Sequence, residues 1–139
     1  MFSNIADKNQ FKELIKLCEF FENQKFKLLY RATEDGFSAE SFHNKCDGIK
    51  DTLTIIRTTN GNVFGGYTGA AWNSGGKFIN DTSSFIFSLI NQSNKSFKAK
   101  CNQNQDSIYG EASYGPSFGG GHDLFISNDS NVNQESYSY

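Results

Sequence analysis

Apolar residues recur at helical spacing near the start of the chain. The series that lies on one helical face is Phe11, Leu14, Ile15 and Cys18. This pattern predicts a helix over residues 7–22, with Asp7 as its N-cap. A second, shorter helix is predicted from Ser38 to about Lys45, because Ser38 can cap it and the acidic Glu40 falls in its first turn.

Most of the remaining chain has short apolar segments, several alternating with polar residues, as β-strands do. The strands predicted in this way cover residues 25–32, 52–58, 63–68, 84–90, 97–101, 107–109 and 123–127. Asn60-Gly61 is a strong hairpin signal, and Gly65-Gly66 predicts a bulge or a close backbone approach. Residues 115–121 form a glycine-rich loop in this interpretation. The pattern predicts an α+β domain, mainly an antiparallel two-sheet β-sandwich with flanking helices.

The length favours one domain over residues 1–139, because 139 residues leave little room for two. The expected core is aromatic, since the chain has 14 Phe, 6 Tyr and 1 Trp. Residues 128–139 are polar, with Val132 as their one aliphatic residue. We therefore predict a loop or disordered tail there.

The charge pattern gives no reason to expect a nucleic-acid partner, because the net charge is −2 and no basic face is evident. Three cysteines, Cys18, Cys46 and Cys101, do not form an even disulfide framework and favour a reducing compartment. The N-terminal residues lack a basic stretch followed by an apolar segment, so we expect no signal peptide and no direct membrane insertion. The predicted location is cytoplasmic.

One segment resembles a hydrolase motif. Gly115-Pro116-Ser117-Phe118-Gly119 fits G-x-S-x-G, with Ser117 as a possible nucleophile and His122 as a possible base. However, Gly120-Gly121-His122 begins a helix poorly, and no acidic residue lies between Ser117 and His122. A glycine-permitted turn is the favoured interpretation, and a small serine hydrolase remains an alternative.

Metal and sugar binding are further alternatives. His43 and Cys46 have H-x-x-C spacing, and His122-Asp123 could add ligands, but two short fragments do not make a zinc site. We favour a hydrogen-bonded structural His43, and we expect Cys46 and Cys101 to be small buried groups and not nucleophiles. Trp72 is flanked by small and polar residues, so core packing and stacking on a carbohydrate, as in a lectin, both stay open. No metal, cofactor or catalytic residue is assigned.

An ordered series of motifs covers about residues 25–127. The motifs are Leu28-Leu29-Tyr30-Arg31-Ala32, Asp35-Gly36-Phe37-Ser38, Phe42-His43-Asn44-Lys45-Cys46-Asp47-Gly48, Thr52-Leu53-Thr54-Ile55-Ile56, Gly61-Asn62-Val63-Phe64-Gly65-Gly66-Tyr67-Thr68, Trp72, Phe85-Ile86-Phe87-Ser88-Leu89 and Gly115-Pro116-Ser117-Phe118-Gly119-Gly120-Gly121-His122-Asp123-Leu124. In this order the series resembles the TLDc domain family.

The resemblance implies two antiparallel sheets packed as a sandwich with flanking helices. It also implies a domain that binds proteins and has no established catalytic residues, in a family linked to protection from oxidative damage. Several members bind and regulate the vacuolar proton-pumping ATPase, so its subunits are the expected partner, with a peripheral location at vacuolar or endosomal membranes. TLDc domains usually continue past the equivalent of Tyr139, so we expect this chain to lack the family's C-terminal strand segments.

Overall fold

The computed structural model describes residues 5–102 and 105–138. Residues 1–4, 103–104 and 139 lie outside this description. The first residues of the segment for which no signal peptide is expected, and the last residue of the predicted tail, are therefore not described. The described part contains three helices: α1 (Lys8–Leu17), α2 (Ala32–Asp35) and α3 (Ala39–Cys46). None of the described helices is both long enough and apolar enough to cross a bilayer.

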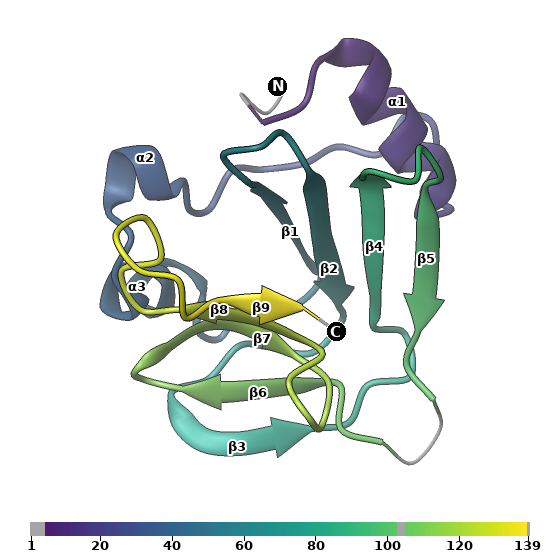
Figure 1. Ribbon diagram of the computed structural model, residues 1–139. Coiled ribbons are helices and arrows are strands. Elements are labelled where there is room, and N and C mark those ends of the chain that lie inside the picture. The colour runs from purple at the N-terminus through teal and green to yellow at the C-terminus, as the bar shows by residue number, and fades with distance from the viewer. Residues whose placement is uncertain (1–4, 103–104, 139) are drawn as a thin grey trace.

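The strands form two separate antiparallel sheets whose strands cross in Figure 1. Sheet 1 has the order β1-β2-β4-β5, and its strands are β1 (Thr52–Arg57), β2 (Val63–Thr68), β4 (Phe85–Ile90) and β5 (Phe97–Lys100). Sheet 2 has the order β3-β6-β7-β8-β9, and its strands are β3 (Gly75–Ile79), β6 (Ile108–Glu111), β7 (Tyr114–Phe118), β8 (Leu124–Ser127) and β9 (Tyr137–Ser138). The predicted α+β sandwich with flanking helices is confirmed.

Sheet 1 is apolar on both faces. The side chains of a strand point alternately to its two sides, and β4 has apolar residues on both. In β4, Phe85, Phe87 and Leu89 pack with Leu14 of α1 on the outer face. Ile86 of the same strand instead joins the cluster that lies between the two sheets. The domain is therefore layered as α1, sheet 1 and sheet 2, with α1 visible over the end of β4 and β5 in Figure 1.

The core between the sheets is built from aromatic and aliphatic side chains. Its fully buried members are Phe42, Cys46, Trp72, Ile108, Phe118 and Leu124. Gly66 of β2 allows the ring of Phe118 to approach, since a Cβ at Gly66 would lie 2.6 Å from Phe118 Cζ. At Gly65 a Cβ would lie 1.8 Å from the carbonyl oxygen of Thr54, and the β2–β4 register shifts between Val63 and Phe64. The close backbone approach predicted at Gly65-Gly66 is confirmed, whereas the irregularity in strand pairing lies before the glycines, between Val63 and Phe64.

Two sequence predictions about the early part of the chain are wrong. The helix predicted over residues 7–22 ends at Leu17, and Glu19 takes a left-handed φ of 60°. Residues 25–31 form no strand, and the chain turns into the short helix α2 at Ala32. The aromatic side chains there pack from an irregular segment: Phe26 contacts Phe11 and Phe20, and Tyr30 contacts Phe42. The apolar residues of this segment therefore indicated correctly that it packs against neighbouring elements, but they did not indicate a strand.

Three differences concern sheet 2. Residues 115–118, expected as part of a glycine-rich loop over 115–121, belong to β7, where their glycine and proline are buried between neighbouring strands. β3 was missed because Gly75-Gly76 carries no apolar alternation. Within the predicted tail, residues 137–138 form β9 and pair with β8, which corrects the expectation of loop or disorder for those residues.

Candidate functional site

The outer face of sheet 2 carries a continuous row of aromatic rings. Each strand contributes one: Phe78 from β3, Tyr109 from β6, Tyr114 from β7, Phe125 from β8 and Tyr137 from β9. Neighbouring ring centroids lie 4.4, 5.8, 4.9 and 5.2 Å apart along this series. We call these five residues, together with His122, the aromatic face. Rings at such separations stabilise one another and hold the side chains in place.

The aromatic face points away from the core. Phe78, Tyr109 and Phe125 alternate along their strands with Ile79, Ile108 and Leu124, which pack between the sheets. Phe78 keeps 43% of its surface exposed and Tyr137 keeps 40%. The described helices pack elsewhere, since Leu14 of α1 contacts sheet 1 and Phe42 of α3 joins the inter-sheet core. Sheet 2 thus presents large apolar rings to solvent, a feature that marks interaction surfaces more often than chance.

His122 lies among these rings, in the turn between β7 and β8. Its imidazole stacks on Phe78 at 5.9 Å with an interplanar angle of 18° and lies 5.2 Å from Tyr109. A left-handed φ of 56° at His122 turns the chain so that the ring folds back over the sheet. Its Nδ1 is buried and has no hydrogen-bond partner within the described part of the chain.

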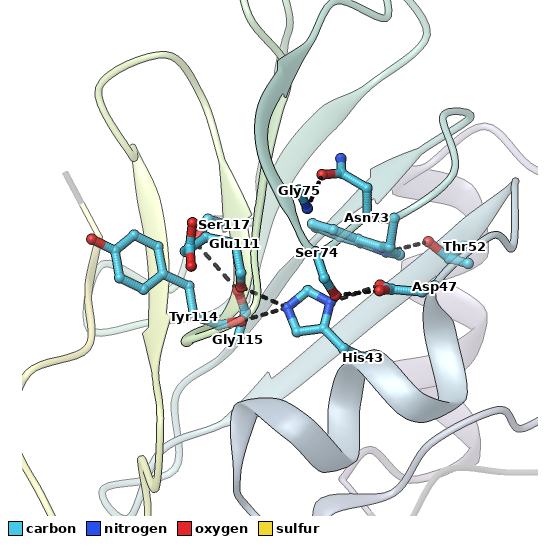
Figure 2. A network of polar contacts seen from close by, with 11 residues as sticks. His43, Asp47, Thr52, Asn73, Ser74, Gly75, Glu111, Tyr114, Gly115 and Ser117 are labelled. Atoms are coloured by element: carbon cyan, nitrogen blue, oxygen red, sulfur yellow. Dashed lines mark hydrogen bonds and ion pairs between the residues drawn. The ribbon is translucent and has the colours of Figure 1, made fainter.

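His43 of α3 holds the β6–β7 turn that carries part of the aromatic face (Figure 2). Its side chain is buried, with Nδ1 2.7 Å from Asp47 Oδ1. Its Nε2 lies 2.8 Å from the carbonyl oxygens of both Glu111 and Tyr114. Because a carbonyl oxygen only accepts, the Nε2–H donates to the turn, and both ring nitrogens face acceptors. The histidine therefore joins α3 to the backbone beside Tyr114.

Asp47 extends this network to the segment before β3. The Ser74 hydroxyl donates to Asp47 Oδ2, and the amide of Gly48 donates to the Trp72 carbonyl oxygen at 2.9 Å. Asp47 and Trp72 also form an isolated parallel bridge. Figure 2 shows His43, Asp47 and Ser74 in one connected line between the helix and sheet 2. With the buried His43 at its centre, this hydrogen-bonded network fixes the relative position of the elements it joins.

A comparison with protein-family models identifies the chain. The model described as the TLDc domain matches residues 2–139. The chain belongs to the TLDc domain family. This match confirms the resemblance carried by the motif series, and it extends over nearly the whole sequence. No curated protein matches the chain. The expectation that the family's C-terminal strand segments are absent from this TLDc domain stays a prediction.

Trp72 is a core residue of this TLDc domain, so its assignment to a carbohydrate site is wrong. Only 2% of its surface is exposed, and its indole Nε1 donates to Thr52 Oγ1 at 3.0 Å. Its ring lies edge-on to Phe42 at 5.3 Å and to Phe118 at 5.4 Å. A sugar could not reach this ring without separating the two sheets.

Ser117 and His122 do not form a nucleophile and base in the TLDc structure. Ser117 is fully buried inside β7, and its hydroxyl donates to the Gly115 carbonyl oxygen at 3.3 Å. The nucleophile elbow requires a tight turn between a strand and a helix in a parallel sheet, whereas β7 pairs antiparallel with β6 and β8. His122 packs on the outer aromatic rings and has no hydrogen bond to Ser117 among the described contacts. The motif is a buried strand.

His43, Cys46 and Cys18 are buried among structural contacts, whereas Cys101, which was expected to be buried, is only partly buried. The predicted hydrogen-bonded role of His43 is confirmed, and Cys46 is 6% exposed in the inter-sheet core. Burial raises the pKa of Cys46 to about 11, with a smaller contribution from Asp47. Burial raises the pKa of Cys18 to about 12, against a smaller opposing effect of Lys98. Such thiols are poor nucleophiles near neutral pH. Within residues 5–102 and 105–138, no group of three His, Cys, Asp or Glu side chains is placed to hold a metal.

Asp81, which lies before β4 of sheet 1, accepts several hydrogen bonds. Asp81 accepts from the Ser84 hydroxyl at 2.7 Å, from Ser83 through both its amide and its hydroxyl, and from the Gly69 amide at 2.7 Å. Partial burial favours its protonated form, but these donors outweigh that effect and lower the pKa of Asp81 to about 2. Asp81 thereby ties the end of β2 to the start of β4.

Sequence reasoning found the scaffold of this site but not the aromatic face itself. His43 was identified as structural from its place on the predicted helix. The five outward-facing rings were not grouped, because they lie on five strands and only the strand pairing places them side by side. The one available signal was alternation around Tyr109 and Phe125, where each aromatic residue follows or precedes a core aliphatic residue.

Proposed function

We propose that this TLDc domain is a non-catalytic protein-interaction module whose binding surface is the aromatic face of sheet 2. The observation that supports this proposal most strongly is the row of rings from Phe78 to Tyr137, which is exposed at its two ends and half-buried between them. A large apolar surface rimmed by polar residues is typical of protein contacts. Tyrosine suits such contacts because its ring is apolar and its hydroxyl can hydrogen-bond.

The absence of a catalytic role is part of the same proposal. It is supported by the structural positions of the residues that could have carried chemistry. Ser117 is buried in a strand, His43 is occupied by three acceptors, and Cys46 has a raised pKa. Nucleophilic catalysis needs a nucleophile within hydrogen-bond reach of its base and accessible to a substrate. None of these three residues meets both conditions.

The partner that we propose is the vacuolar proton-pumping ATPase, because the resemblance to the TLDc family implies it. On this proposal the domain works in the cytoplasm, peripherally at vacuolar or endosomal membranes, and contributes to resistance against oxidative stress. These statements rest on the family and not on a contact within the structure.

The partner proposal is tested with purified components. The full chain is immobilised, and purified soluble subunits of the proton-pumping ATPase from the same organism are passed over it. We expect one subunit or subcomplex to bind the wild-type chain and to bind a Phe78→Ala variant more weakly. The matched control is Phe97→Ala, which removes an exposed ring (54% exposed) from sheet 1. Absence of binding to all subunits would remove the partner proposal.

The non-catalytic proposal is tested by covalent labelling. A fluorophosphonate probe reacts with activated serine, so mass spectrometry of the treated native chain should find no adduct at Ser117. An adduct at Ser117 that disappears on denaturation before treatment would contradict the proposal and favour the hydrolase alternative.

A further inference from the structure

Charge is distributed unevenly between the two sheets. No Lys or Arg occurs after Lys100, so all 13 basic residues lie within residues 1–100. The acidic residues after Lys100 are Asp106, Glu111, Asp123, Asp129 and Glu135. Strands β6 to β9 and their connections come from this acidic segment, and Lys77 on β3 is the one basic residue within the strands of sheet 2. The charged residues within the strands of sheet 2 are Lys77 and Glu111, and the connections from β6 to β9 add Asp123, Asp129 and Glu135 without any basic residue. Sheet 2 together with its connections is therefore acidic, although the net charge of the whole chain is only −2.

At least one carboxylate lies directly beside the rings. A Cβ built on Gly76 would lie 3.2 Å from Glu111 Oε2 and 3.8 Å from the Tyr109 hydroxyl, so these two atoms border the same small space. Glu111 accepts a hydrogen bond from the Ser113 hydroxyl at 3.4 Å. Among the described residues, none of the ion pairs involves an acidic residue beyond Lys100. Glu111 therefore has no ion-pair partner within the part of the chain that the structure describes.

Aromatic faces and free carboxylates attract the same kind of ligand. A cation within about 6 Å of a ring centroid is held by the negative face of the ring. The guanidinium group of arginine is planar, so it can stack on Tyr109 or Phe78 and also pair with the carboxylate of Glu111 through two hydrogen bonds. Lysine offers only a compact charge without the stacking surface.

The same charges disfavour the other occupants of an apolar sheet face. A second copy of the chain packed face to face would bring two surfaces that carry the same negative charges together, and like charges across an interface cost free energy. Anionic phospholipids and nucleic acid would be repelled for the same reason. Complementarity of charge therefore selects a basic protein segment.

We propose that the aromatic face binds an arginine-rich segment of a partner protein, with guanidinium groups stacked on Phe78, Tyr109 and Tyr114 and paired with Glu111. This inference deepens the interaction module proposed above and rests on it. Binding is expected to weaken as salt increases, because exposed charges are screened.

The test uses three synthetic octapeptides of arginine, lysine or glutamate and the ¹⁵N-labelled full chain. We expect amide shifts in β3, β6, β7 and the 119–123 turn with the arginine peptide, weaker shifts at the same residues with the lysine peptide, and none with the glutamate peptide. Shifts spread over α1 and sheet 1, or equal binding of the arginine and lysine peptides, would overturn the inference.

Single substitutions then measure the contributions of the rings and of the charges to peptide binding separately. Tyr109→Ala and Glu111→Gln should each weaken arginine-peptide binding about threefold to fivefold in calorimetric titration. The matched controls are Phe97→Ala, an exposed ring of sheet 1, and Glu13→Gln, an exposed carboxylate of α1, which should leave the affinity unchanged. Circular dichroism of each variant establishes that it is folded, and unchanged binding by a folded Tyr109→Ala chain would overturn the inference.

The two proposals fail separately. If ATPase subunits bind the chain but the arginine peptide causes no shift at the aromatic face, the arginine inference is wrong and the interaction module stands. If the peptide binds at the face but no ATPase subunit does, the named partner is wrong and the inference stands.

Discussion

Replacing Gly66 by valine should destabilise the domain by overpacking the space between the sheets. A Cβ at this position would lie 2.6, 2.7 and 2.9 Å from the Cζ, Cε1 and Cε2 atoms of Phe118. The Phe118 ring cannot swing away freely, because it is 2% exposed and lies edge-on to Trp72 at 5.4 Å. The β2 strand or the Phe118 ring must therefore shift.

The expected magnitude follows from the size of the added group. Overpacking a tight core costs about 1–3 kcal/mol, and the two methyl groups of valine place Gly66→Val toward the upper end, at about 3 kcal/mol. For Gly66→Ala we expect about 1–2 kcal/mol, since alanine adds one carbon and restricts the unfolded chain slightly. A loss of about 3 kcal/mol would lower the melting temperature by roughly 6–12 °C in a domain of this size.

Urea unfolding monitored by the fluorescence of Trp72 measures these free energies. The decisive variant is Gly66→Ala combined with Phe118→Leu, which removes the three ring atoms that the new Cβ would meet. We expect the double variant to be about 1 kcal/mol more stable than the sum of the single effects predicts. Gly65→Ala provides the contrast, because its Cβ would lie 1.8 Å from the Thr54 carbonyl oxygen, a backbone atom that no side-chain truncation removes. Additive effects of Gly66→Ala and Phe118→Leu, or a Gly66→Val variant as stable as the wild type, would refute this reasoning.

Three further outcomes follow from the site geometry. His43→Leu should lower the free energy of unfolding by about 2–4 kcal/mol, since the carbonyl and carboxylate acceptors around it lose their donor. The pKa of Asp81 is about 2 when folded and 3.8 ordinarily, so its contribution to stability, about 1 kcal/mol after screening by solvent, is present above pH 4 and lost as pH falls toward 2. Ellman's reagent should modify the half-buried Cys101 before the buried Cys18 and Cys46.

Each of these outcomes has its own control. Asn44→Ala changes an exposed neighbour on α3 and should leave stability within about 0.5 kcal/mol of the wild type, so an equal loss there would contradict the role of His43. Asp81→Asn should flatten the change in unfolding free energy between pH 5 and pH 2, and an unchanged slope would contradict the Asp81 assignment. Modification of all three thiols at one rate in the folded chain, measured by mass spectrometry, would contradict their assigned burial.

The central strands of sheet 1 could be predicted from the sequence. Phe85, Phe87 and Leu89 alternate with Ile86 and Ser88, and the structure forms β4 over these residues. β2 was predicted with its observed limits because Asn60-Gly61 fixes the hairpin before it. In both places the local pattern and the tertiary packing favour the same conformation.

Prediction failed where the packing partner decides the conformation. Residues 25–31 have the apolar content of a strand, yet they lie against α1 and α3 without forming one. The segment 114–118 contains glycine and proline, which are rare in central strands, but its backbone is buried between β6 and β8. The aromatic face could not be predicted for a similar reason. Each aromatic residue can be read from the sequence, but their proximity depends on the strand order and register of sheet 2.

The layered order of α1 on sheet 1 has a consequence for motion. The α1 layer can leave without breaking strand pairing and without opening the core between the sheets, because α1 and the residues just after it are attached through side chains such as Leu14 and Cys18 and through the pairing of Glu19 with Lys98. Its release would uncover Phe85, Phe87 and Leu89 while the Trp72 core stays closed. The amides of α1 should therefore exchange with deuterium through a partial opening of lower free energy than the one that exposes β2 and β4.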